Sequence, residues 1–362
     1  MTSIPLLQVS GSFYEMGHAH GLAYRDAIRR YTEGRIRLAQ SDTWTGRSLS
    51  REEVLALAQA CVAEHWAYAP DLMEELEGIG DATGLSLAEL VITNGFTDFI
   101  DVVYAQAQQR GVTSQAADDC TAFIVPDSRS QEGGGFLGQT WDMHDDSTEY
   151  VILLRSQPTE GPTCLTFTIT GCLGMIGMNE AGVAIGINNL MGNDGQIGVT
   201  WPFVVRKALQ QTDADGALAC ITQAKLAGAH NYLILDRQGR GYNVEAMSTA
   251  THVTPLGQEP LVHTNHCLLP ETQARTRPRL PESQASTEAR LAQGRRLLAA
   301  NGPVTLEQLM ALTRDETICV HAKPPFHVAT CGAAIMQPAS GAFWALLGLP
   351  CENEYERFEV TG

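Results

Sequence analysis

The feature that most constrains the fold is a change of sequence pattern between residues 112 and 120. Before it, apolar residues recur at helical spacing, and the first helical segment opens with a capping box formed by Ser12 and Glu15. From Cys120 onward, short strand-like runs alternate with glycine-bearing turns, and only a few helical segments interrupt them. Helices followed by consecutive strands do not fit βαβ alternation. The sequence therefore predicts an α+β fold with two antiparallel sheets flanked by helices.

The predicted elements follow this division along the chain. Helices are expected over residues 12–40, 48–69, 70–84, 86–111, 200–211, 213–228, 286–301 and 305–314. Strands and hairpins are expected over residues 120–128, 133–143, 150–157, 163–171, 175–190, 231–247, 260–269 and 330–350. The polar, proline-bearing stretch 271–285 is expected to be a surface loop.

The charge of the chain argues against one class of partner. It carries 24 Lys and Arg against 41 Asp and Glu, for a net charge of −17. Its only lysines are Lys207, Lys225 and Lys323. Binding to nucleic acid or to an anionic membrane needs clustered basic residues, so neither partner is expected. The acidity serves solubility or, in a sharper interpretation, attracts a cationic substrate.

Two further patterns bear on where the protein resides. No run of about 18 apolar residues occurs, and the start, MTSIPLLQVSGSFYE, lacks a basic region followed by a long apolar core. The nine cysteines are dispersed without C-x-x-C pairs, which is typical of free thiols in a reducing compartment. A cytoplasmic protein without a transmembrane helix or a secretory signal is expected.

Cys120 lies at the start of a predicted strand, directly after Asp119. A cysteine there can be a small buried core residue, or a nucleophile that needs a base to remove its proton. No histidine is near Cys120 in the sequence, although one could lie near it in space. Cleavage between Asp119 and Cys120 would create another base, because a free α-amine has a pKa of about 7.7–8.0. The thiol itself could make this cut by attacking the Asp119 carbonyl, with hydrolysis of the resulting thioester.

Six segments in order along the chain resemble a known family. They are SFYEMGHAHG, YAPDLMEELEGIGDATG with TNGFTDF, DCTAF, LGQTWDM, GMNEAGVAIGINN and LVHTNHCLLP. They resemble the acyl-coenzyme A:6-aminopenicillanate acyltransferase family, which is peptidase C45-like and belongs to the N-terminal nucleophile (Ntn) hydrolase superfamily. The resemblance implies a four-layer αββα sandwich, a precursor that cleaves itself, and amide chemistry at a new N-terminal cysteine.

The resemblance also implies how the chain is divided. Residues 1–119 would form a helical α fragment, and residues 120–362 would form the αββα β fragment that carries catalysis. The two fragments would stay together as a heterodimer within one integrated domain. Homo-oligomerisation beyond this pair is left open.

Four residues receive catalytic roles from the resemblance, with Cys120 as the nucleophile. Asp142 in GQTWDM matches the aspartate that holds the α-amine, and its charge would raise the pKa of that amine. Asn265 in HTNHC matches an asparagine near the oxyanion, where its NH₂ group can donate to the developing negative charge. Asn188 in GINN matches a second polar position facing the nucleophile, and Asn189 is the near alternative.

The chain departs from the family at three places. Asp119 stands where the acyltransferase has a glycine before the nucleophile, and Gln139 stands where related penicillin and bile-salt amidases have an arginine. In TICVHAKPPFHV, Val320 and His321 stand where the acyltransferase has another arginine. The residues that could replace its charge are His321, Lys323 and His327. These departures affect the choice of substrate more than the reaction, and the candidate substrate-binding residues are Trp141, Asn189, His266 and His321.

No cofactor is expected. His263, His266 and Cys267 in HTNHC could suggest a metal site, but their spacing lacks a second clear pair of ligands. The sequence contains no HExxH, GxSxG or P-loop pattern.

Together these observations predict a self-processing N-terminal cysteine amidohydrolase. It would cleave a linear amide bond of a small acylated amine or amino-acid substrate through a thioester intermediate. The first alternative is an N-acyltransferase, in which an amine replaces water and an acyl-CoA or an amide is the donor. The second alternative is an uncleaved relative that binds a ligand without catalysis.

Overall fold

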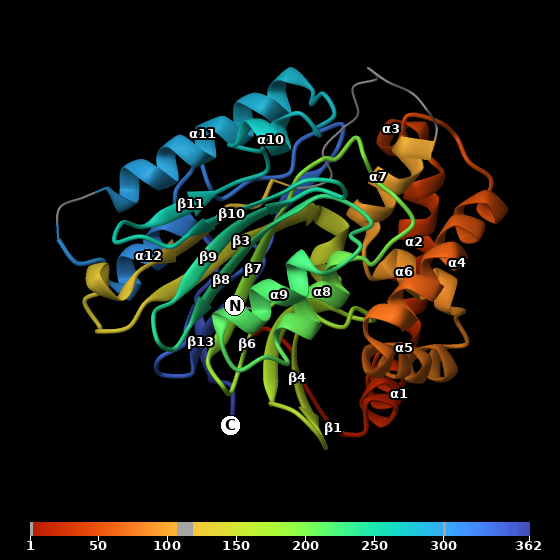
Figure 1. Cartoon of the computed structure of the whole chain (residues 1–362), viewed down its shortest axis with the longest axis horizontal. Helices are drawn as coiled ribbons and strands as arrows, with labels where there is room; N and C mark the ends of the chain where they lie inside the picture. The colour runs from red at the N-terminus through yellow and green to blue at the C-terminus, as the bar shows by residue number, and fades with distance from the viewer. Residues whose placement is uncertain (1–2, 107–118, 300–301) are drawn as a thin grey trace.

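Two stacked β-sheets form the centre of the computed structural model, which describes residues 3–106, 119–299 and 302–362 (Figure 1). Within these residues, the larger sheet has eight strands in the order β1-β4-β5-β6-β7-β8-β9-β10. The smaller sheet has six strands in the order β11-β2-β3-β12-β13-β14. The predicted α+β fold with two sheets is confirmed. Neighbouring strands are antiparallel except for β1 and β4, which pair in parallel.

The strands have the following bounds. In the larger sheet they are β1 Leu6–Gly11, β4 Val151–Pro158, β5 Cys164–Ile169, β6 Ile176–Asn179, β7 Val183–Asn189, β8 His230–Asp236, β9 Gly241–Ala246 and β10 Thr251–Pro255. In the smaller sheet they are β11 Leu261–His263, β2 Ala122–Val125, β3 Phe136–His144, β12 Val328–Gln337, β13 Ala342–Leu347 and β14 Glu356–Glu359. Strands β2 and β3 are buried along their whole length, as expected for strands with a layer on each face.

Helices cover both outer faces of the sheet pair. Helices α8 (Trp201–Ala208) and α9 (Ala214–Thr222) pack on the larger sheet, and α11 (Pro281–Leu298) and α12 (Leu306–Arg314) pack on the smaller one. Strand β3 faces β7 and β8 between the sheets. The layers therefore follow the order αββα that the family resemblance implies. The short α10 (Pro270–Gln273) precedes α11, and two 3₁₀ turns occupy Asp127–Arg129 and Asp145–Tyr150.

The N-terminal helices lie together beside the sheets, in red to orange in Figure 1. They are α1 Phe13–Ala23, α2 Arg25–Gln40, α3 Asp42–Thr45, α4 Arg51–Tyr68, α5 Pro70–Thr83, α6 Leu87–Thr93 and α7 Phe96–Gln106. Helices α1 and α5 approach closely because glycines line their contact. A Cβ atom on Gly17 would lie 1.8 Å from the Glu75 carbonyl oxygen, and one on Gly78 would lie 2.2 Å from the Tyr14 carbonyl oxygen. These glycines belong to two of the segments that carry the family resemblance.

The structure corrects several sequence expectations. Strand β1 was not predicted, because its partner β4 lies far away in the sequence and local pattern cannot reveal the pairing. The predicted helix 12–40 is two helices that meet at Tyr24. The predicted helix 86–111 divides at Gly95, whose φ of 146° is outside the helical range, and its residues beyond 106 lie outside the described residues. The predicted loop 271–285 contains most of α10 and the start of α11.

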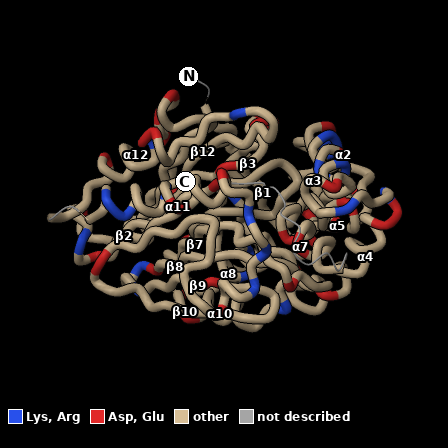
Figure 2. The backbone as a smooth tube through the Cα atoms, turned by 90° about the horizontal axis from the view of Figure 1, so that it is seen from above, with Lys and Arg blue, Asp and Glu red and all other residues tan. Residues whose placement is uncertain are grey.

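Charged residues are interspersed on the outer helices and loops, with blue and red segments close together in Figure 2. Over the stretches that the structure describes, no helix combines the length and the apolar character needed to cross a membrane.

Candidate active site

Cys120 and Asp142 lie side by side at one end of the smaller sheet. Strands β2 and β3 pair with Ala122 opposite Gln139, which brings the start of β2 next to the end of β3. The backbone N–H of Asp142 donates to the Cys120 Sγ at 3.3 Å, and the thiol lies 3.7 Å from the Asp142 carbonyl oxygen. Cys120 is fully buried. The Cys120 thiol is therefore held against the backbone of Asp142.

The Asp142 carboxylate is the most unusual group at this site. Both of its oxygens are buried, and neither accepts a hydrogen bond of good geometry from any residue within 3–106, 119–299 or 302–362. Burial raises the pKa of Asp142 well above its usual value, while the positive charge of Arg290 and the hydroxyl groups of Thr330 and Thr140 partly oppose the rise. Buried carboxylates normally have a partner, because an isolated buried charge is costly. The site is therefore suited to a cationic group beside Cys120.

Two asparagines approach Cys120 from different elements. Asn188, near the end of β7, donates from Nδ2 to the Cys120 carbonyl oxygen at 3.3 Å. Asn265 follows β11, and the pairing of His263 with Ala122 brings it beside Cys120. Its Nδ2 donates to the Asn189 carbonyl oxygen at 3.3 Å. Because an amide NH₂ has two N–H groups, Asn265 has a second donor for a negative charge that develops nearby.

Arg290, which the sequence analysis does not single out, connects these groups. From α11, its Nη1 donates to the Cys120 carbonyl oxygen at 2.7 Å and to Thr121 Oγ1 at 3.1 Å. Its Nη2 donates to Asp119 Oδ1 and to Asn265 Oδ1, both at 3.0 Å. One buried guanidinium thus holds both residues of the bond between Asp119 and Cys120, together with a candidate oxyanion donor.

The sequence does contain a signal for Arg290. The buried face of α11 is formed by Ser283, Thr287, Arg290, Leu291, Gly294 and Leu298, which recur at helical spacing. An arginine at a core-facing position of such a stripe is rare unless it has polar partners inside the protein. That position marks it as a residue with a specific role.

The other predicted substrate-binding residues make contacts within the protein. Trp141 packs edge-to-face against Phe167 between the sheets, on the opposite face of β3 from Asp142. Asn189 contributes its backbone carbonyl to Asn265. His266 contacts Thr287 Oγ1 at 3.0 Å through Nδ1, and burial lowers the pKa of His266 to about 4.

The candidates for replacing the family arginines are also spread out. Gln139 lies between the sheets, where its Oε1 accepts from the Ile187 backbone N–H at 2.6 Å. His327 lies 3.7 Å from Asp145 in an exposed pair. His321 and Lys323 line a cavity beside α11. The buried positive charge next to Cys120 is instead that of Arg290.

The three potential metal ligands in HTNHC do not point toward a common position. His263 contacts Glu245 Oε1 at 3.0 Å through Nε2, whereas Cys267 points toward the Met247 sulfur at 3.7 Å. His266 contacts Thr287 instead. These three side chains therefore have separate partners.

Two cavities lie along α11. One, of about 660 Å³, is lined by Asp119 and by residues that include Glu282, Glu316, His321 and Lys323. The other, of about 380 Å³, is lined by residues that include His266, Arg277 and Glu288. Asp119 is partly exposed, and Cys120 lies buried behind it. The first cavity is therefore the candidate substrate cavity, because Asp119, which lines it, is bonded directly to Cys120.

Comparison with known proteins gives one family match. Residues 129–324 match the family described as "Acyl-coenzyme A:6-aminopenicillanic acid acyl-transferase". A protein of Emericella nidulans named "Acyl-coenzyme A:6-aminopenicillanic-acid-acyltransferase 40 kDa form" is 26% identical over 262 residues, which cover 72% of this chain and 68% of that protein. An uncharacterized protein of Archaeoglobus fulgidus is 23% identical over 263 residues, which cover 65% of this chain and 42% of that protein.

Solved structures with similar chains include the following two proteins. A mutant of conjugated bile acid hydrolase from Clostridium perfringens has a TM-score of 0.46 and 11% identity, over 67% of this chain and 92% of that chain. Penicillin V acylase from Agrobacterium tumefaciens has a TM-score of 0.40 and 10% identity, over 67% of this chain and 86% of that chain. The family match covers more than half of this chain and agrees with the resemblance carried by its sequence motifs.

Proposed function

Because the chain belongs to the acyl-coenzyme A:6-aminopenicillanic acid acyl-transferase family, we propose that it cleaves its own backbone before Cys120 and then hydrolyses a linear amide bond of a small substrate. One observation carries the proposal. The buried Asp142 carboxylate, next to the Cys120 thiol, accepts no hydrogen bond of good geometry from the described part of the chain. A new α-ammonium group at residue 120 would give this carboxylate a partner of opposite charge.

The self-cleavage step needs only the thiol and water. The Cys120 Sγ attacks the carbonyl carbon of Asp119, and the amide nitrogen of Cys120 leaves as an amine that takes up the thiol proton. Water then hydrolyses the thioester, which gives an Asp119 carboxylate and a free Cys120 with its thiol and α-amine. Arg290 would fix both sides of this bond through the Asp119 carboxylate and the Cys120 carbonyl oxygen.

The two fragments would stay associated after cleavage. Strand β1 of the first fragment pairs along its length with β4 of the second. A buried ion pair also joins them, with Glu75 of α5 and Arg206 of α8 at 2.9 Å. We therefore expect an α–β heterodimer rather than a dissociated pair.

Turnover would use the same thiol with a new base. The α-amine accepts the thiol proton, the thiolate attacks the amide carbonyl, and an oxyanion forms. Asn265 would donate its second Nδ2 N–H to this oxyanion, and one such donor contributes about 2.7–4 kcal/mol in a well-studied protease. The amine product leaves with the proton, and water hydrolyses the thioester to release the acid. Asp142 would hold the α-amine in place throughout.

The mass of the purified protein tests the self-cleavage. The wild-type chain is expected to give two fragments, the second of which begins at Cys120. Cys120→Ala should remain one piece and should be inactive. Cys61→Ala is the matched control, because Cys61 is buried in α4, away from the site, and should process normally. A single unbroken wild-type chain that hydrolyses amides would overturn the proposal.

Asp142→Asn tests the role of the carboxylate. We expect processing and kcat to fall by roughly 10²–10⁴-fold, the range that a positioned acid or base contributes. Thermal stability should stay the same or rise, because a neutral amide replaces a buried carboxylate that is costly in the uncleaved chain. Intact mass, kcat and Tm measure the three quantities. A variant that processes and turns over at the wild-type rate would remove Asp142 from the mechanism.

A second candidate function, N-acyl transfer, is favoured by the name of the family that matches this chain. The thioester would then be attacked by an amine instead of water. Hydroxylamine added during turnover distinguishes the two functions. Efficient formation of the hydroxamate in place of the free acid indicates transfer, whereas unchanged acid release indicates hydrolysis.

A further inference from the structure

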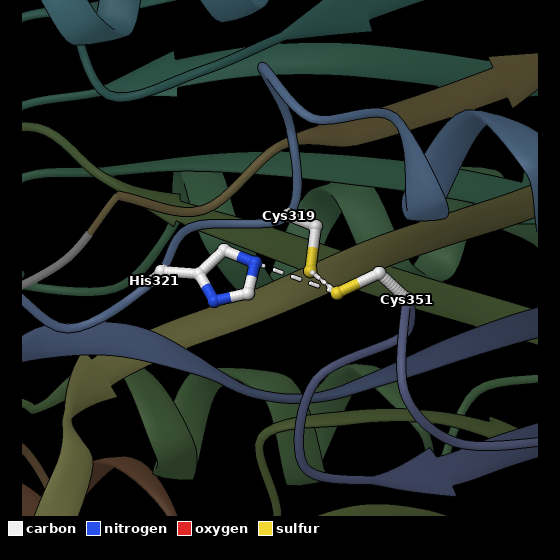
Figure 3. Close-up of side chains that lie close together, drawn as sticks. All are labelled: Cys319, His321 and Cys351. Atoms are coloured by element: carbon white, nitrogen blue, oxygen red, sulfur yellow. Dashed lines mark hydrogen bonds between the residues drawn. The ribbon is translucent and has the colours of Figure 1, made fainter.

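Three potential metal ligands converge beside the candidate substrate cavity. Cys319 and His321 come from the segment after α12, and Cys351 comes from the loop after β13. Figure 3 shows the two sulfur atoms and the imidazole ring directed toward one another. The Cys319 and Cys351 sulfurs are 3.2 Å apart, and His321 Nε2 is 3.5 Å from the Cys351 sulfur. All three ligand atoms lie within 4.8 Å of one another.

The two segments that carry these residues are fixed to the fold. Arg314, at the end of α12, donates from Nε to the Pro350 carbonyl oxygen at 3.0 Å and from Nη2 to the Asn353 carbonyl oxygen at 3.3 Å. Val320 exchanges two hydrogen bonds with Thr330 of β12, each of 2.9 Å. These hydrogen bonds therefore fix the position of Cys319 and His321 relative to Cys351.

The spacing of the ligand atoms fits a tetrahedral zinc ion. Zn–S bonds of about 2.3 Å and Zn–N bonds of about 2.0–2.1 Å put two sulfurs roughly 3.8 Å apart and a sulfur and a nitrogen roughly 3.5 Å apart. The sulfur–nitrogen distance of 3.5 Å already matches. The two sulfurs would need to separate by about half an ångström, which the exposed Cys351 side chain can accommodate.

The chemistry of the donors also selects a borderline-soft cation. Thiolate and imidazole ligands favour zinc over calcium or magnesium, which prefer oxygen. Two thiolates would also neutralise the charge of one Zn²⁺.

We propose that Cys319, His321 and Cys351 bind one Zn²⁺ ion at the rim of the candidate substrate cavity. Three protein ligands leave a fourth position for water or another ligand, as in zinc sites that are not purely structural. Cys319 and His321 both line the cavity of about 660 Å³ that also contains Asp119. The ion would link the segment after α12 to the loop after β13 and would place a positive centre beside this cavity.

Metal analysis of tag-free protein tests the site directly. The protein is purified in a non-thiol reductant without chelator, stripped of metal, and titrated with Zn²⁺ against a chromogenic chelator. We expect one zinc per chain. We also expect Cys351→Ser and His321→Ala to weaken binding more than about 100-fold, because the loss of a supporting partner alone costs roughly 10–100-fold. Co²⁺ in place of Zn²⁺ should give a thiolate-to-cobalt charge-transfer band that Cys351→Ser removes.

Two controls separate this site from other thiols and imidazoles. Cys120→Ala should keep its zinc, which excludes the candidate nucleophile as a ligand. His252→Ala should also keep it, because His252 is a partly exposed histidine whose recorded partner is Glu271. Binding that survives Cys351→Ser and His321→Ala, or a reduced protein that binds no zinc, overturns the proposal. The proposal is also overturned if the isolated protein contains a Cys319–Cys351 disulfide and still binds no zinc after that disulfide is reduced. None of these readouts depends on amide hydrolysis, so their failure leaves the proposed function untouched.

Discussion

Two buried arginines of this protein, Arg206 and Arg290, have contrasting partners. Arg206 of α8 donates from both terminal nitrogens to the two oxygens of Glu75, at 3.2 and 2.9 Å, and also to the Leu173 carbonyl. Arg290 of α11 instead divides its donors among the side chains of Asp119, Thr121 and Asn265 and the Cys120 carbonyl. Both arginines are almost completely buried.

The difference separates a structural role from a positioning role. Arg206 and Glu75 neutralise each other and join α5 to α8, so their contacts are complete without a ligand. Around Arg290, the nearby Asp142 has a buried carboxylate that accepts no hydrogen bond of good geometry from the described residues. A buried ion pair that is complete supports the fold. The unpaired carboxylate beside Arg290 instead leaves room for the α-ammonium group that we propose at residue 120.

The largest change in unfolding free energy should come from breaking the ion pair between Arg206 and Glu75. Arg206→Met leaves Glu75 buried without its partner, which costs about 3–5 kcal/mol of unfolding free energy for such pairs. The burial that already raises the pKa of Glu75 would then act without the opposing charge of Arg206. Urea unfolding followed by circular dichroism measures the loss. The kcat of the molecules that remain folded should be unchanged, because Arg206 does not contact the Cys120 site.

A surface arginine and a double variant are the controls for this prediction. Arg37→Met removes an exposed i,i+4 pair with Glu33 and should leave stability nearly unchanged. Glu75→Leu combined with Arg206→Met should recover much of the lost stability, because no buried charge is then left alone. If Arg206→Met lowers kcat while stability is kept, the structural role assigned to Arg206 is wrong.

At Arg290 we expect a loss of activity with only a small loss of stability. Arg290→Met should slow processing and turnover roughly 10- to 150-fold, since hydrogen bonds to charged groups contribute about 1.5–3 kcal/mol. Its stability loss should be smaller than that of Arg206→Met, because its carboxylate partner Asp119 is 19% exposed and can be hydrated. Measured kcat, intact mass and unfolding free energy together test this split between activity and stability.

The pH profile distinguishes positioning by Arg290 from a merely structural effect. The Arg290 charge lowers the pKa of Asp142 against the raising effect of burial, so its removal should raise that pKa further. The acidic limb of the kcat/KM profile of Arg290→Met should therefore move to higher pH. Arg290→Lys should restore the position of this limb but not the full rate, because lysine keeps the charge and loses the planar fork. Identical profiles for all three proteins would contradict the assignment.

The residues of the candidate site differ in how well the sequence could predict them. Cys120, Asp142, Asn188 and Asn265 lie in short motifs at strand ends, where sequence pattern and family resemblance both apply, and the structure brings them together at Cys120. Their catalytic roles remain predictions. Arg290 lies in the middle of a helix, and its partners come from a strand start and a loop after β11. Its position therefore depends on how α11 packs on the sheet, which local pattern does not contain.

The fold also has features that the local sequence pattern predicts and features that it does not. The change from helical to strand spacing near Cys120 correctly predicts the α+β class and the two sheets, because periodicity is a local property. The pairing of β1 with β4 and the breaks at Tyr24 and Gly95 were missed. The β1–β4 pairing and the break at Gly95 involve residues distant in the sequence, since a Cβ atom on Gly95 would lie 2.4 Å from Thr200 Cβ. The glycines at the α1–α5 contact show the reverse case, in which a motif fixes a close approach of two helices.

The predicted effect that is smallest at neutral pH concerns protonation near Arg206, and it grows as the pH falls below about 6.5. His20 is fully buried and accepts the Gly171 backbone N–H at Nε2, at 3.1 Å, so its ring is neutral. Burial, with a further contribution from the charge of Arg206, lowers the pKa of His20 to about 4. The ordinary pKa of an unfolded histidine is about 6.5. Between these two values the unfolded chain binds more protons than the folded one, so stability is present above the upper value and is lost as the pH falls.

Substitution of His20 by glutamine should reveal this contribution and sharpen the contrast. His20→Gln keeps an acceptor for Gly171 but cannot titrate, so its stability should fall less steeply between about pH 6.5 and 4, by up to about 1.4 kcal/mol per pH unit. Urea unfolding of both proteins across this range measures the difference. His252→Gln, which alters a partly exposed histidine next to Glu271, is the control and should follow the wild-type curve. Equal pH dependence in His20→Gln and wild type would mean that the pKa of His20 is the same in the folded and the unfolded chain, contrary to the lowering by burial and by the charge of Arg206.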